Sequence, residues 1–452
     1  MAKRQVTHIQ GQRGESFLQL VRGVPQDKVL CVTIDVHKAY HRIMIVNGYY
    51  EIVERAFSID ILRDGLKQLC QLIDQAVTRT GARVLFIGME PTGHYHENLA
   101  RHLRQRYPHV RLVNSYAVKE NRNQRMLRAE KDDDKDLCSI AELVLRNECF
   151  PYQPLTGDYL HLQNWVRFRL SKVRLRTRLM NQITGHLDRI FPGLVRPTKG
   201  SQGEQSSPFG RFWDTLAAQR LLEICPDPRR LANMSPAALV TLYHQRHWRM
   251  GQKQAEKIVA FAQQVLLPEP EVIAARLPLL QIDLELLQAV ERAIANADEQ
   301  IGCYLARTRG QVLTQVKGIG VLHAANYVAG IGNPLHYEHA GQTFKRSGLI
   351  SGRNDSGTHQ NAGAGQRITK MGDPYLRSGL IQVTRSLCLW QQELAQYNIG
   401  LRARGKHPGV AWVATARRVN GVLFALLRDQ SSYDAARLRR NGGKKTAATD
   451  VS

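Results

Sequence analysis

The chain has 452 residues, and its 63 Lys and Arg against 39 Asp and Glu give a formal net charge of +24. That excess is far beyond what solubility requires and indicates a polyanionic partner, above all nucleic acid. No segment approaches the roughly 18 consecutive apolar residues of a membrane-spanning helix. The N-terminal segment also lacks the apolar core of a secretory signal, so we expect a cytoplasmic protein that does not enter a membrane.

The length predicts two or three domains, and we expect the N-terminal segment to lie outside them. Residues 1–27 are polar and basic, and we expect them to form a loose arm.

Residues 28–150 alternate between strand and helix patterns. The stretch "VLCVTIDVHKAYHRIMIVNGYYEIVERAFS" contains three β-rich runs separated by polar and glycine turns. A helical pattern follows in "IDILRDGLKQLCQLIDQAV", then a buried strand "RVLFIGME", a helix from about residue 94 to residue 106, and the strand "VRLVN". Strands that alternate with helices after an initial meander predict an α/β domain with a mixed central sheet.

Residues 151–278 are mainly helical, with a glycine-, serine- and proline-rich loop in "FPGLVRPTKGSQGEQSSPFG" that we expect to be flexible. Within this region the stretch "VRFRLSKVRLRTR" carries six cations and no acid, and the cations fall all around the helix. An ordinary solvated face usually includes acids, so we favour binding to a phosphate backbone. The six residues are Arg167, Arg169, Lys172, Arg174, Arg176 and Arg178.

Residues 279–309 show a heptad repeat typical of a coiled coil. Its apolar residues form two seams: Leu280, Leu287, Ile294 and Ile301 in the first, and Val290, Ala297 and Tyr304 in the second. Asp283 interrupts the second seam. The repeat fits a coiled coil that pairs two protomers, and it fits a single helix packed on its own domain nearly as well.

Residues 310–430 are α-helical and punctuated by glycines. "TQVKGIGVLHAANYVAGIG" has the form of two helices joined by a turn, as in helix-hairpin-helix elements, with Gly318 and Gly320 in the turn. The backbone amides of such a turn and of the following helix N-terminus can hold a phosphate. Residues 431–452 are basic, and we expect them to be disordered.

The seven cysteines are scattered and form no Cys-x-x-Cys pair. Each lies in or beside an apolar segment, so we expect reduced core residues and neither zinc ligands nor disulfides.

Two predicted strands of the N-terminal domain end in a carboxylate. Asp35 closes the buried run "CVTID", and Glu90 follows "VLFIGM" in the same way. A carboxylate at the end of a buried strand is costly to desolvate unless it is paired or bound to a cation. Either residue alone is more often a turn or cap residue, but the repetition favours a shared role.

The stretch "EKDDDKDL" places further carboxylates at the start of a helical pattern. Asp133 and Asp136 are three residues apart and share one face of a helix turn. The helix dipole favours one or two acids there, but it does not explain four aspartates in five positions. A hard divalent cation, expected to be Mg²⁺, prefers several carboxylate oxygens, and two cations can clamp a phosphodiester under attack. We therefore predict a nuclease-like metal site of Asp35, Glu90, Asp133 and Asp136, with nearby histidines such as His37 contacting phosphate or bases.

These motifs resemble a family, the DEDD transposases of the IS-one-ten class, which are bridge-RNA-guided serine recombinases related to the Piv DNA invertase. The family's N-terminal motifs correspond to "IDVHKAYH", "MEPTGHYHENLA" and "KDDDKDL" in this chain. Asp132 stands where the family usually has threonine and Leu137 where it has alanine. The register of the three consecutive aspartates therefore stays open, and Asp132 or Asp134 could replace Asp133.

The C-terminal half carries further matches in "VKGIGVLHAANYVAGIG", "TFKRSGLISGRNDSGTHQ" and "ITKMGDPYLRSGLIQ". Through them the resemblance aligns Ser356 with the family's nucleophilic serine. Asp355 stands where a first serine is frequent, and Ser347 and Ser351 are the rival candidates. A loop serine before glycine is by itself usually a turn residue, so this assignment comes from the resemblance.

The resemblance implies a RuvC-like (RNase H-like) N-terminal domain and a mainly helical C-terminal serine domain. It implies that the four carboxylates hold Mg²⁺ against a scissile phosphate while Ser356 forms a covalent phosphoserine. The composite site would be assembled across protomers of a dimer or tetramer, and a structured noncoding bridge RNA would select donor and target DNA. Besides the basic run, the candidates for backbone contacts are Lys119, Arg122, Arg125, Arg128, Arg367, Lys370 and Arg377.

Two alternatives stay open. A metal-dependent junction nuclease would use the four carboxylates with water as the nucleophile and would need no serine. A catalytically inactive nucleic-acid-binding protein would keep the charge without the chemistry, although four intact carboxylates argue against it.

Overall fold

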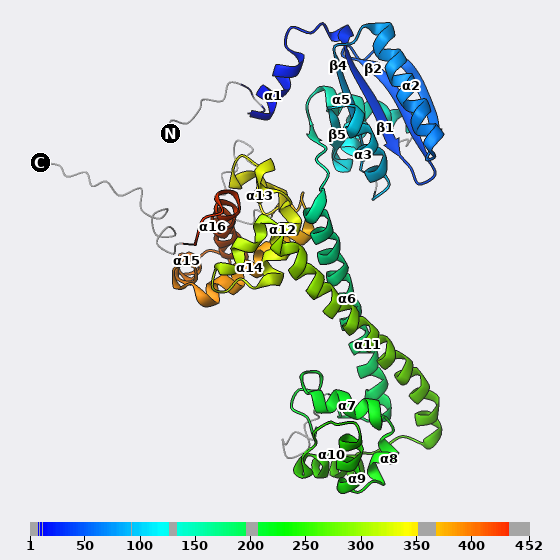
Figure 1. Cartoon of the computed structure of the whole chain (residues 1–452), viewed down its shortest axis with the longest axis vertical. Helices are drawn as coiled ribbons and strands as arrows, with labels where there is room; N and C mark the ends of the chain where they lie inside the picture. The colour runs from blue at the N-terminus through cyan, green and yellow to red at the C-terminus, as the bar shows by residue number, and fades with distance from the viewer. Residues whose placement is uncertain are drawn as a thin grey trace, which may run out of the picture. The chain divides into compact units, whose positions relative to one another are not determined.

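The computed structural model describes residues 8, 10, 12–91, 93–125, 133–195, 207–350 and 368–433. The chain divides into two compact units, Met1–Pro154 and Leu155–Ser452. Figure 1 shows the helices and strands of both.

The first unit is built on a six-stranded sheet in the order β3-β2-β1-β4-β5-β6. The strands are β1 (Val29–Val36), β2 (Tyr40–Asn47), β3 (Ile52–Asp60), β4 (Val84–Met89), β5 (Val110–Val113) and β6 (Cys149–Pro151). β1 and β5 each run parallel to β4, whereas β2, β3 and β6 pair antiparallel with their neighbours. The predicted mixed sheet is confirmed and is consistent with a RuvC-like domain. The sequence prediction missed β6, whose three residues are too few to show a pattern.

Helices cover both faces of this sheet. α2 (Arg63–Thr80) and α3 (His96–Arg106) share a core with Leu30 and Val32 of β1, and α4 (Ser115–Arg125) and α5 (Asp133–Leu145) share one with Val29 and Cys31. Successive side chains of a strand point to opposite faces. The odd-numbered side chains of β1 therefore point toward α5.

The segment expected to be a loose arm contains a helix, α1 (Gln12–Val21). Phe17, Leu20 and Val21 pack against the same core as α5, and the Phe17 ring stacks on Phe86 with 5.3 Å between centroids. The spacing of these three residues is helical and puts them on one face. The prediction of a loose arm was wrong for this part because the basic residues around it concealed a short apolar face.

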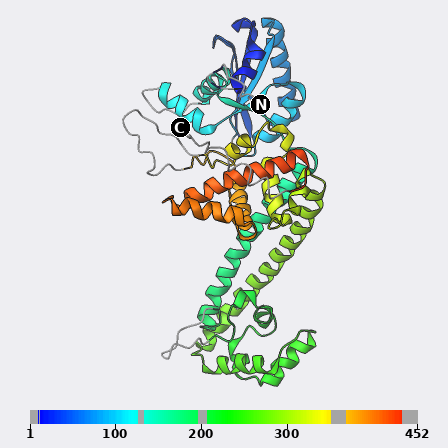
Figure 2. The ribbon, with the colours of Figure 1, turned by 90° about the vertical axis from the view of Figure 1, so that its left-hand side faces the viewer.

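The second unit is almost entirely helical. Its two long helices, α6 (Gly157–Ile190) and α11 (Pro270–Ala306), lie side by side in both Figure 1 and Figure 2. The shorter helices between them are α7 (Leu216–Ile224), α8 (Pro228–Ala232), α9 (Pro236–Gln245) and α10 (Gln252–Gln264). The helices that follow are α12 (Val321–Ile331), α13 (Ala340–Arg346), α14 (Pro374–Trp390), α15 (Gln392–Ala403) and α16 (Pro408–Asp429).

The predicted heptad lies within α11, and its seam is buried inside the chain. Leu280, Leu287 and Ile294 share a core with Leu179 and Ile183 of α6. Asp283, the residue that interrupts the seam, has its Oδ2 3.4 Å from Nε2 of His186 on α6. This is the second of the two interpretations of the heptad, a helix packed on its own domain. The interpretation that this seam pairs two protomers was wrong.

The Gly-x-Gly turn leads into α12, with Gly320 as its N-cap residue. Gly318 has φ of +102°, and a Cβ there would lie 2.7 Å from the Trp390 ring. Glycine is therefore needed both for its backbone conformation and for close packing. The element before the turn is a short 3₁₀ helix (Arg309–Gln315) in place of the predicted α-helix.

Among the described helices, only α16 is long and apolar enough to span a membrane. Half of its apolar window is buried in the protein, and Leu423 and Leu427 belong to the core of the second unit.

All seven cysteines are free thiols, as predicted. Cys303 on α11 is exposed, which the expectation of core positions did not foresee.

Candidate metal centre

Strand pairing brings the two strand-end carboxylates together. Ile34 of β1 pairs with Met89 of the parallel strand β4, so Asp35 and Glu90 occupy the next two facing positions. Asp35 is one of the odd-numbered residues of β1, so its side chain points to the face covered by α5. Its side chain is buried, with 7% of the residue exposed.

Helix α5 brings the third segment to the same place. Its first turn holds Asp133, Asp134 and Asp136. The helix lies directly against β4 because Gly88 has no side chain, and a Cβ there would collide with Val144 of α5. This close approach holds the N-terminus of α5 next to the ends of β1 and β4.

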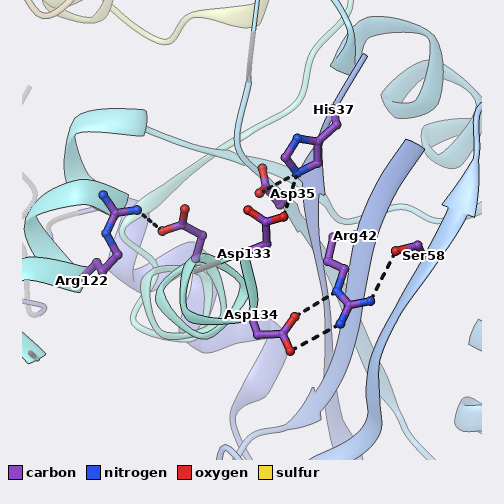
Figure 3. A network of polar contacts seen from close by, with 8 residues as sticks. Asp35, His37, Arg42, Ser58, Arg122, Asp133 and Asp134 are labelled. Atoms are coloured by element: carbon purple, nitrogen blue, oxygen red, sulfur yellow. Dashed lines mark hydrogen bonds and ion pairs between the residues drawn. The ribbon is translucent and has the colours of Figure 1, made fainter. Parts of the chain in front are cut away.

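The first acidic group consists of Asp35, His37 and Asp133. One ligand atom from each of the three lies within 4.8 Å of the others. His37 Nε2 lies 3.1 Å from Asp35 Oδ2 and 3.8 Å from Asp133 Oδ2, as Figure 3 shows. The His37 ring stacks on Tyr40 with 4.7 Å between centroids, which holds its orientation.

A second acidic group lines an adjoining cavity of about 330 Å³, which the first group also borders through Asp35 and His37. Glu90 and Asp136 are its acids, and Lys119 and Arg122 of α4 are its cations. Arg122 forms an ion pair with Asp136. Glu90 accepts a hydrogen bond from Ser115, the first residue of α4. All four predicted carboxylates therefore lie in these two groups. Asp35 belongs to the first group and also lines the cavity of the second.

Burial raises the pKa of the Asp35 carboxyl above its ordinary value. His37 lowers that pKa, whereas the negative charges of Asp136 and Asp133 raise it further. The pKa of Glu90 is also raised, first by burial and then by Asp35 and Asp136, while the hydrogen bond from Ser115 opposes the shift. The negative charges of these carboxylates repel one another because they lie close together, and a bound divalent cation would relieve that repulsion.

The donor set fits a divalent cation. Carboxylate oxygens are the ligands of Mg²⁺, and an imidazole nitrogen adds a ligand that softer ions such as Mn²⁺ accept more readily. His37 Nε2 is buried and lies 3.1 Å from Asp35 Oδ2, the carboxylate oxygen that faces it. A cation between His37, Asp35 and Asp133 would satisfy that nitrogen and both carboxylates.

Sequence reasoning had assigned His37 to phosphate or base contacts, yet the structure brings it into the acidic group. The sequence offered only the closeness of His37 to Asp35, because β1 ends at Val36 and the parity of the strand does not extend to His37.

The structure distinguishes two of the three consecutive aspartates. Asp134 turns away from the group and binds Arg42, whose Nε lies 2.9 Å from Asp134 Oδ1 (Figure 3). Asp133 faces Asp35 and His37. Asp132 lies outside the described residues.

Comparison with known proteins identifies the family. Residues 32–192 match a family of DEDD transposases of IS110 elements, and residues 310–398 match the IS116/IS110/IS902 family of transposases. Together the two segments cover more than half of the chain. The chain carries transposase domains of the IS110/IS116 family.

Individual relatives of this chain agree with that assignment. A probable family 20 transposase of Pseudomonas aeruginosa is 26% identical over 354 residues, which are 77% of this chain and 85% of the relative. The insertion element IS110 uncharacterized 43.6 kDa protein of Streptomyces coelicolor is 27% identical over 263 residues, 57% of this chain. The alignment spans 60% of that relative. The insertion element IS116 uncharacterized 44.8 kDa protein of Streptomyces clavuligerus is 26% identical over 312 residues, 68% of this chain and 73% of the relative.

The predicted nucleophile, Ser356, lies outside the described residues, as do its rival Ser351 and the neighbouring Asp355. The third candidate, Ser347, is fully buried. Its Oγ donates a hydrogen bond to the carbonyl oxygen of Phe344 at 2.6 Å. A buried hydroxyl with an internal acceptor is unsuited to attack DNA, so Ser347 is the weakest of the three.

Several residues of the basic run on α6 are paired within the second unit. Arg169 forms an ion pair with Asp298 of α11. Arg167 lies 3.6 Å from Asp373 Oδ2, and its guanidinium stacks on Tyr375 together with that of Arg174. These contacts explain part of the run as structural. Arg174 and Arg178 are exposed, whereas Lys172 and Arg176 are half-buried.

The remaining cationic candidates lie in different surroundings. Arg122 lines the acidic cavity. Lys370 is exposed, and Arg377 donates to the carbonyl oxygen of Ser347 at 3.4 Å. The backbone of Arg125 ends α4, while Arg128 and Arg367 lie outside the described residues.

Proposed function

We propose that this protein cuts and rejoins DNA during transposition, with Asp35, Glu90, Asp133 and Asp136 holding divalent cations at the scissile phosphate. The observation that carries the proposal is the convergence of carboxylates from two strand ends and one helix start. Membership in the transposase family supports it. His37 joins the proposed ligands because its Nε2 lies within reach of two of these carboxylates.

The two acidic groups would hold two cations, and Asp35 borders both groups. Bound cations would neutralise charge on the phosphate and stabilise the charge that develops during cleavage. The burial of Asp35 and the partial burial of Glu90 strengthen these electrostatic interactions, because less water screens the charges. Lys119 and Arg122 add positive charge to the cavity wall, where they would attract the phosphate backbone, and Arg122 orients Asp136 through their ion pair.

We further propose, on the strength of the family motifs, that Ser356 is the nucleophile and that the physiological cation is Mg²⁺. The Ser356 oxygen would bond to phosphorus while the bond from phosphorus to a deoxyribose oxygen breaks. The serine would lose its proton to solvent, and the leaving oxygen would take one up. The phosphoserine would keep the bond energy for rejoining. A structured noncoding bridge RNA would select donor and target DNA, with a homo-oligomer as the working species.

The experiment combines the purified protein with its flanking noncoding RNA, donor and target DNA, and Mg²⁺ or Mn²⁺. The readout is a protein–DNA adduct that survives denaturation. We expect the adduct to disappear in Asp133→Asn and Ser356→Ala. Asp134→Asn and Ser347→Ala are the matched controls, since Asp134 binds Arg42 and the Ser347 hydroxyl is buried.

Each outcome has a distinct meaning. Metal-dependent cleavage without an adduct, unaffected by Ser356→Ala, would make the protein a junction nuclease that uses water. Equal loss in Asp133→Asn and Asp134→Asn would contradict the proposed ligand set. Absence of any metal-dependent cleavage, while DNA and RNA still bind, would favour an inactive nucleic-acid-binding protein.

A further inference from the structure

The helices α7–α10 form a module at one end of the second unit, and α12–α16 lie at the other end, as Figures 1 and 2 both show. The module shares a core with Leu187 near the end of α6 and Ile273 near the start of α11. The C-terminal helices share a different core with Val166, near the start of α6. Between Val166 and Leu187, α6 advances about 32 Å. The module is therefore a distinct part of the unit, remote from the C-terminal helices.

A basic turn joins α9 to α10 on this module. The stretch "HQRHWRMGQKQAEK", residues 244–257, contains four Lys or Arg, two His and a single acid, Glu256. All four cations are exposed, and Lys253 and Lys257 lie four residues apart on one face of α10. We call the four the tip cations: Arg246, Arg249, Lys253 and Lys257.

The turn is held in one conformation by Trp248. The N–H groups of Arg246 and Trp248 donate to the carbonyl oxygen of Tyr243 at 3.0 and 2.9 Å. The Trp248 ring packs edge-on against the buried Tyr243 ring, with 6.1 Å between centroids. The guanidinium groups of Arg246 and of Arg220 on α7 lie 5.8 and 4.8 Å from the centre of the Trp248 ring. The folded protein therefore holds two cationic groups around one ring, and they need little further ordering to bind an anion.

The acids of the module do not neutralise the tip cations. Asp214 lies 3.7 Å from Arg211, and Asp227 caps the N-terminus of α8. Glu256 accepts a hydrogen bond at 3.1 Å from the side chain one turn earlier on α10, and Glu223 is exposed on α7. In the part of the chain that the structure describes, none of these acids forms an ion pair with a tip cation. The turn therefore presents a net positive charge to solvent.

We propose that the tip cations bind the phosphate backbone of a nucleic-acid duplex, at a contact separate from the metal centre. Exposed cations without acid partners gain affinity for nucleic acid because binding releases its condensed counterions. The N-terminus of α10 adds partial positive charge beside them, since Gly251, its N-cap residue, offers no side-chain acceptor to the free amides.

Trp248 favours a duplex over a single strand. Proteins that bind single strands stack bases on open aromatic rings. The Trp248 ring is half-buried and already contacts two guanidinium groups and Tyr243, so it is not open to a base. Contacts to phosphate carry no sequence information, so the tip cations would add affinity for any duplex.

This inference goes beyond the proposed function and does not depend on it. A protein without metal-dependent cleavage would keep the same contact. The separation of the module from α12–α16 is close to one helical turn of DNA, about 34–36 Å. One duplex along α6 could therefore reach both ends of the second unit.

Salt titration of duplex binding tests the contact in the full-length protein. The probe is a duplex DNA of about 30 bp, roughly 100 Å long, and EDTA keeps divalent cations away from the metal centre. Arg249→Ala with Lys253→Ala should reduce the slope of log affinity against log salt concentration by about 1.8, because two phosphate contacts of about 0.9 each are lost. Arg211→Ala with Arg292→Ala is the matched control, since it removes two exposed cations of the same unit that lie outside the turn.

The control pair should leave the slope unchanged, and the loss in the test pair should be equal for unrelated sequences. A slope in the test pair no different from that of the wild type, or equal reductions in both pairs, would overturn the proposal. A duplex RNA of the same sequence, titrated in parallel, shows whether the contact takes DNA, RNA or both. An effect on binding to phosphatidylserine vesicles, and on neither duplex, would assign the tip cations to a membrane surface and overturn the proposal too.

Acetylation of lysines gives a direct measurement on the unaltered protein. Bound duplex should protect Lys253 and Lys257 from acetic anhydride, with loss of modification measured by mass spectrometry. Lys67 on α2, which pairs with Asp64 on the protein surface, is the internal control and should react equally with and without duplex. Equal modification of Lys253 and Lys257 in the free and the bound protein would contradict the proposed contact.

Discussion

The close approach of α5 to the sheet at Gly88 predicts that Gly88→Ala disturbs the metal centre from a distance. A Cβ at this position would overlap Val144 Cγ2 and lie 3.3 Å from Ile140 Cγ2, both on α5. A carbon–carbon contact needs about 3.5–4.0 Å, so α5 must retreat by on the order of 1 Å. Val144 cannot easily turn aside, because a valine in a helix has one strongly preferred rotamer.

The displacement matters because α5 carries Asp133 and Asp136, whereas Asp35 stays on β1. Metal–ligand distances tolerate about 0.2 Å, so a shift of roughly 1 Å should weaken Mn²⁺ or Mg²⁺ binding by about 10-fold or more. Overpacking should also cost about 1–3 kcal/mol of folding free energy. For a unit of this size that loss lowers the melting temperature by roughly 2–12 °C.

Calorimetric melting and metal titration of the full-length protein measure both effects. Val144→Ala removes the colliding methyl group and by itself should cost about 2 kcal/mol for the two lost methyls and the cavity. The loss of folding free energy in the double variant should be smaller than the sum of the losses in the two single variants. The difference, the coupling energy, should be about 0.5–3 kcal/mol. Gly302→Ala on α11, where a Cβ meets nothing within 4 Å, is the control and should leave metal binding unchanged. Additive costs, or metal binding unaffected by Gly88→Ala, would refute the reasoning.

Three further predictions concern single side chains. Burial raises the pKa of Asp35 and Glu90 in the folded protein. Their protonated forms therefore stabilise the metal-free protein fully below about pH 4. This stabilisation is lost as the pH rises through the raised pKa values. Melting in EDTA should show this loss, Asp35→Asn should reduce it, and saturating Mn²⁺ should reverse the trend because cations bind the deprotonated groups. Bound Mn²⁺ at 100 times its Kd should stabilise the wild type by about 2.7 kcal/mol, and Asp35→Asn should abolish this stabilisation. A melting temperature that Mn²⁺ still raises in Asp35→Asn would argue against Asp35 as a ligand. His37→Ala should weaken Mn²⁺ binding by about 10- to 100-fold and Mg²⁺ binding by less, and equal effects in titration calorimetry would exclude His37 as a direct ligand. Arg178→Ala should reduce the slope of log affinity for duplex DNA against log salt concentration by about 0.9, because one phosphate contact is lost. Arg169→Ala should mainly lower the melting temperature, because Arg169 pairs with Asp298. The opposite pattern would make Arg169 the DNA contact and Arg178 the structural residue.

Much of the first unit could be predicted from local sequence. The β-rich runs and the apolar periodicity of α2 each reveal an element because they depend only on near neighbours in the chain. The carboxylates at Asp35 and Glu90 stood out because a charge at the end of a buried strand needs a partner. The place of His37 could not be predicted in this way, because β1 ends at Val36 and the side chain of His37 is oriented by its contacts with Asp35 and Tyr40.

The tertiary structure decided which neighbour covers each face. Sequence alone left open whether Asp133 or Asp134 belongs to the acidic group, because a helix start presents successive side chains in different directions. Packing of α5 on β4 turned Asp133 toward Asp35 and Asp134 toward Arg42. In the same way the heptad in α11 showed that an apolar seam exists, but periodicity does not name the surface that fills it. The partner of that seam is α6 of the same chain, and only the folded arrangement could identify it.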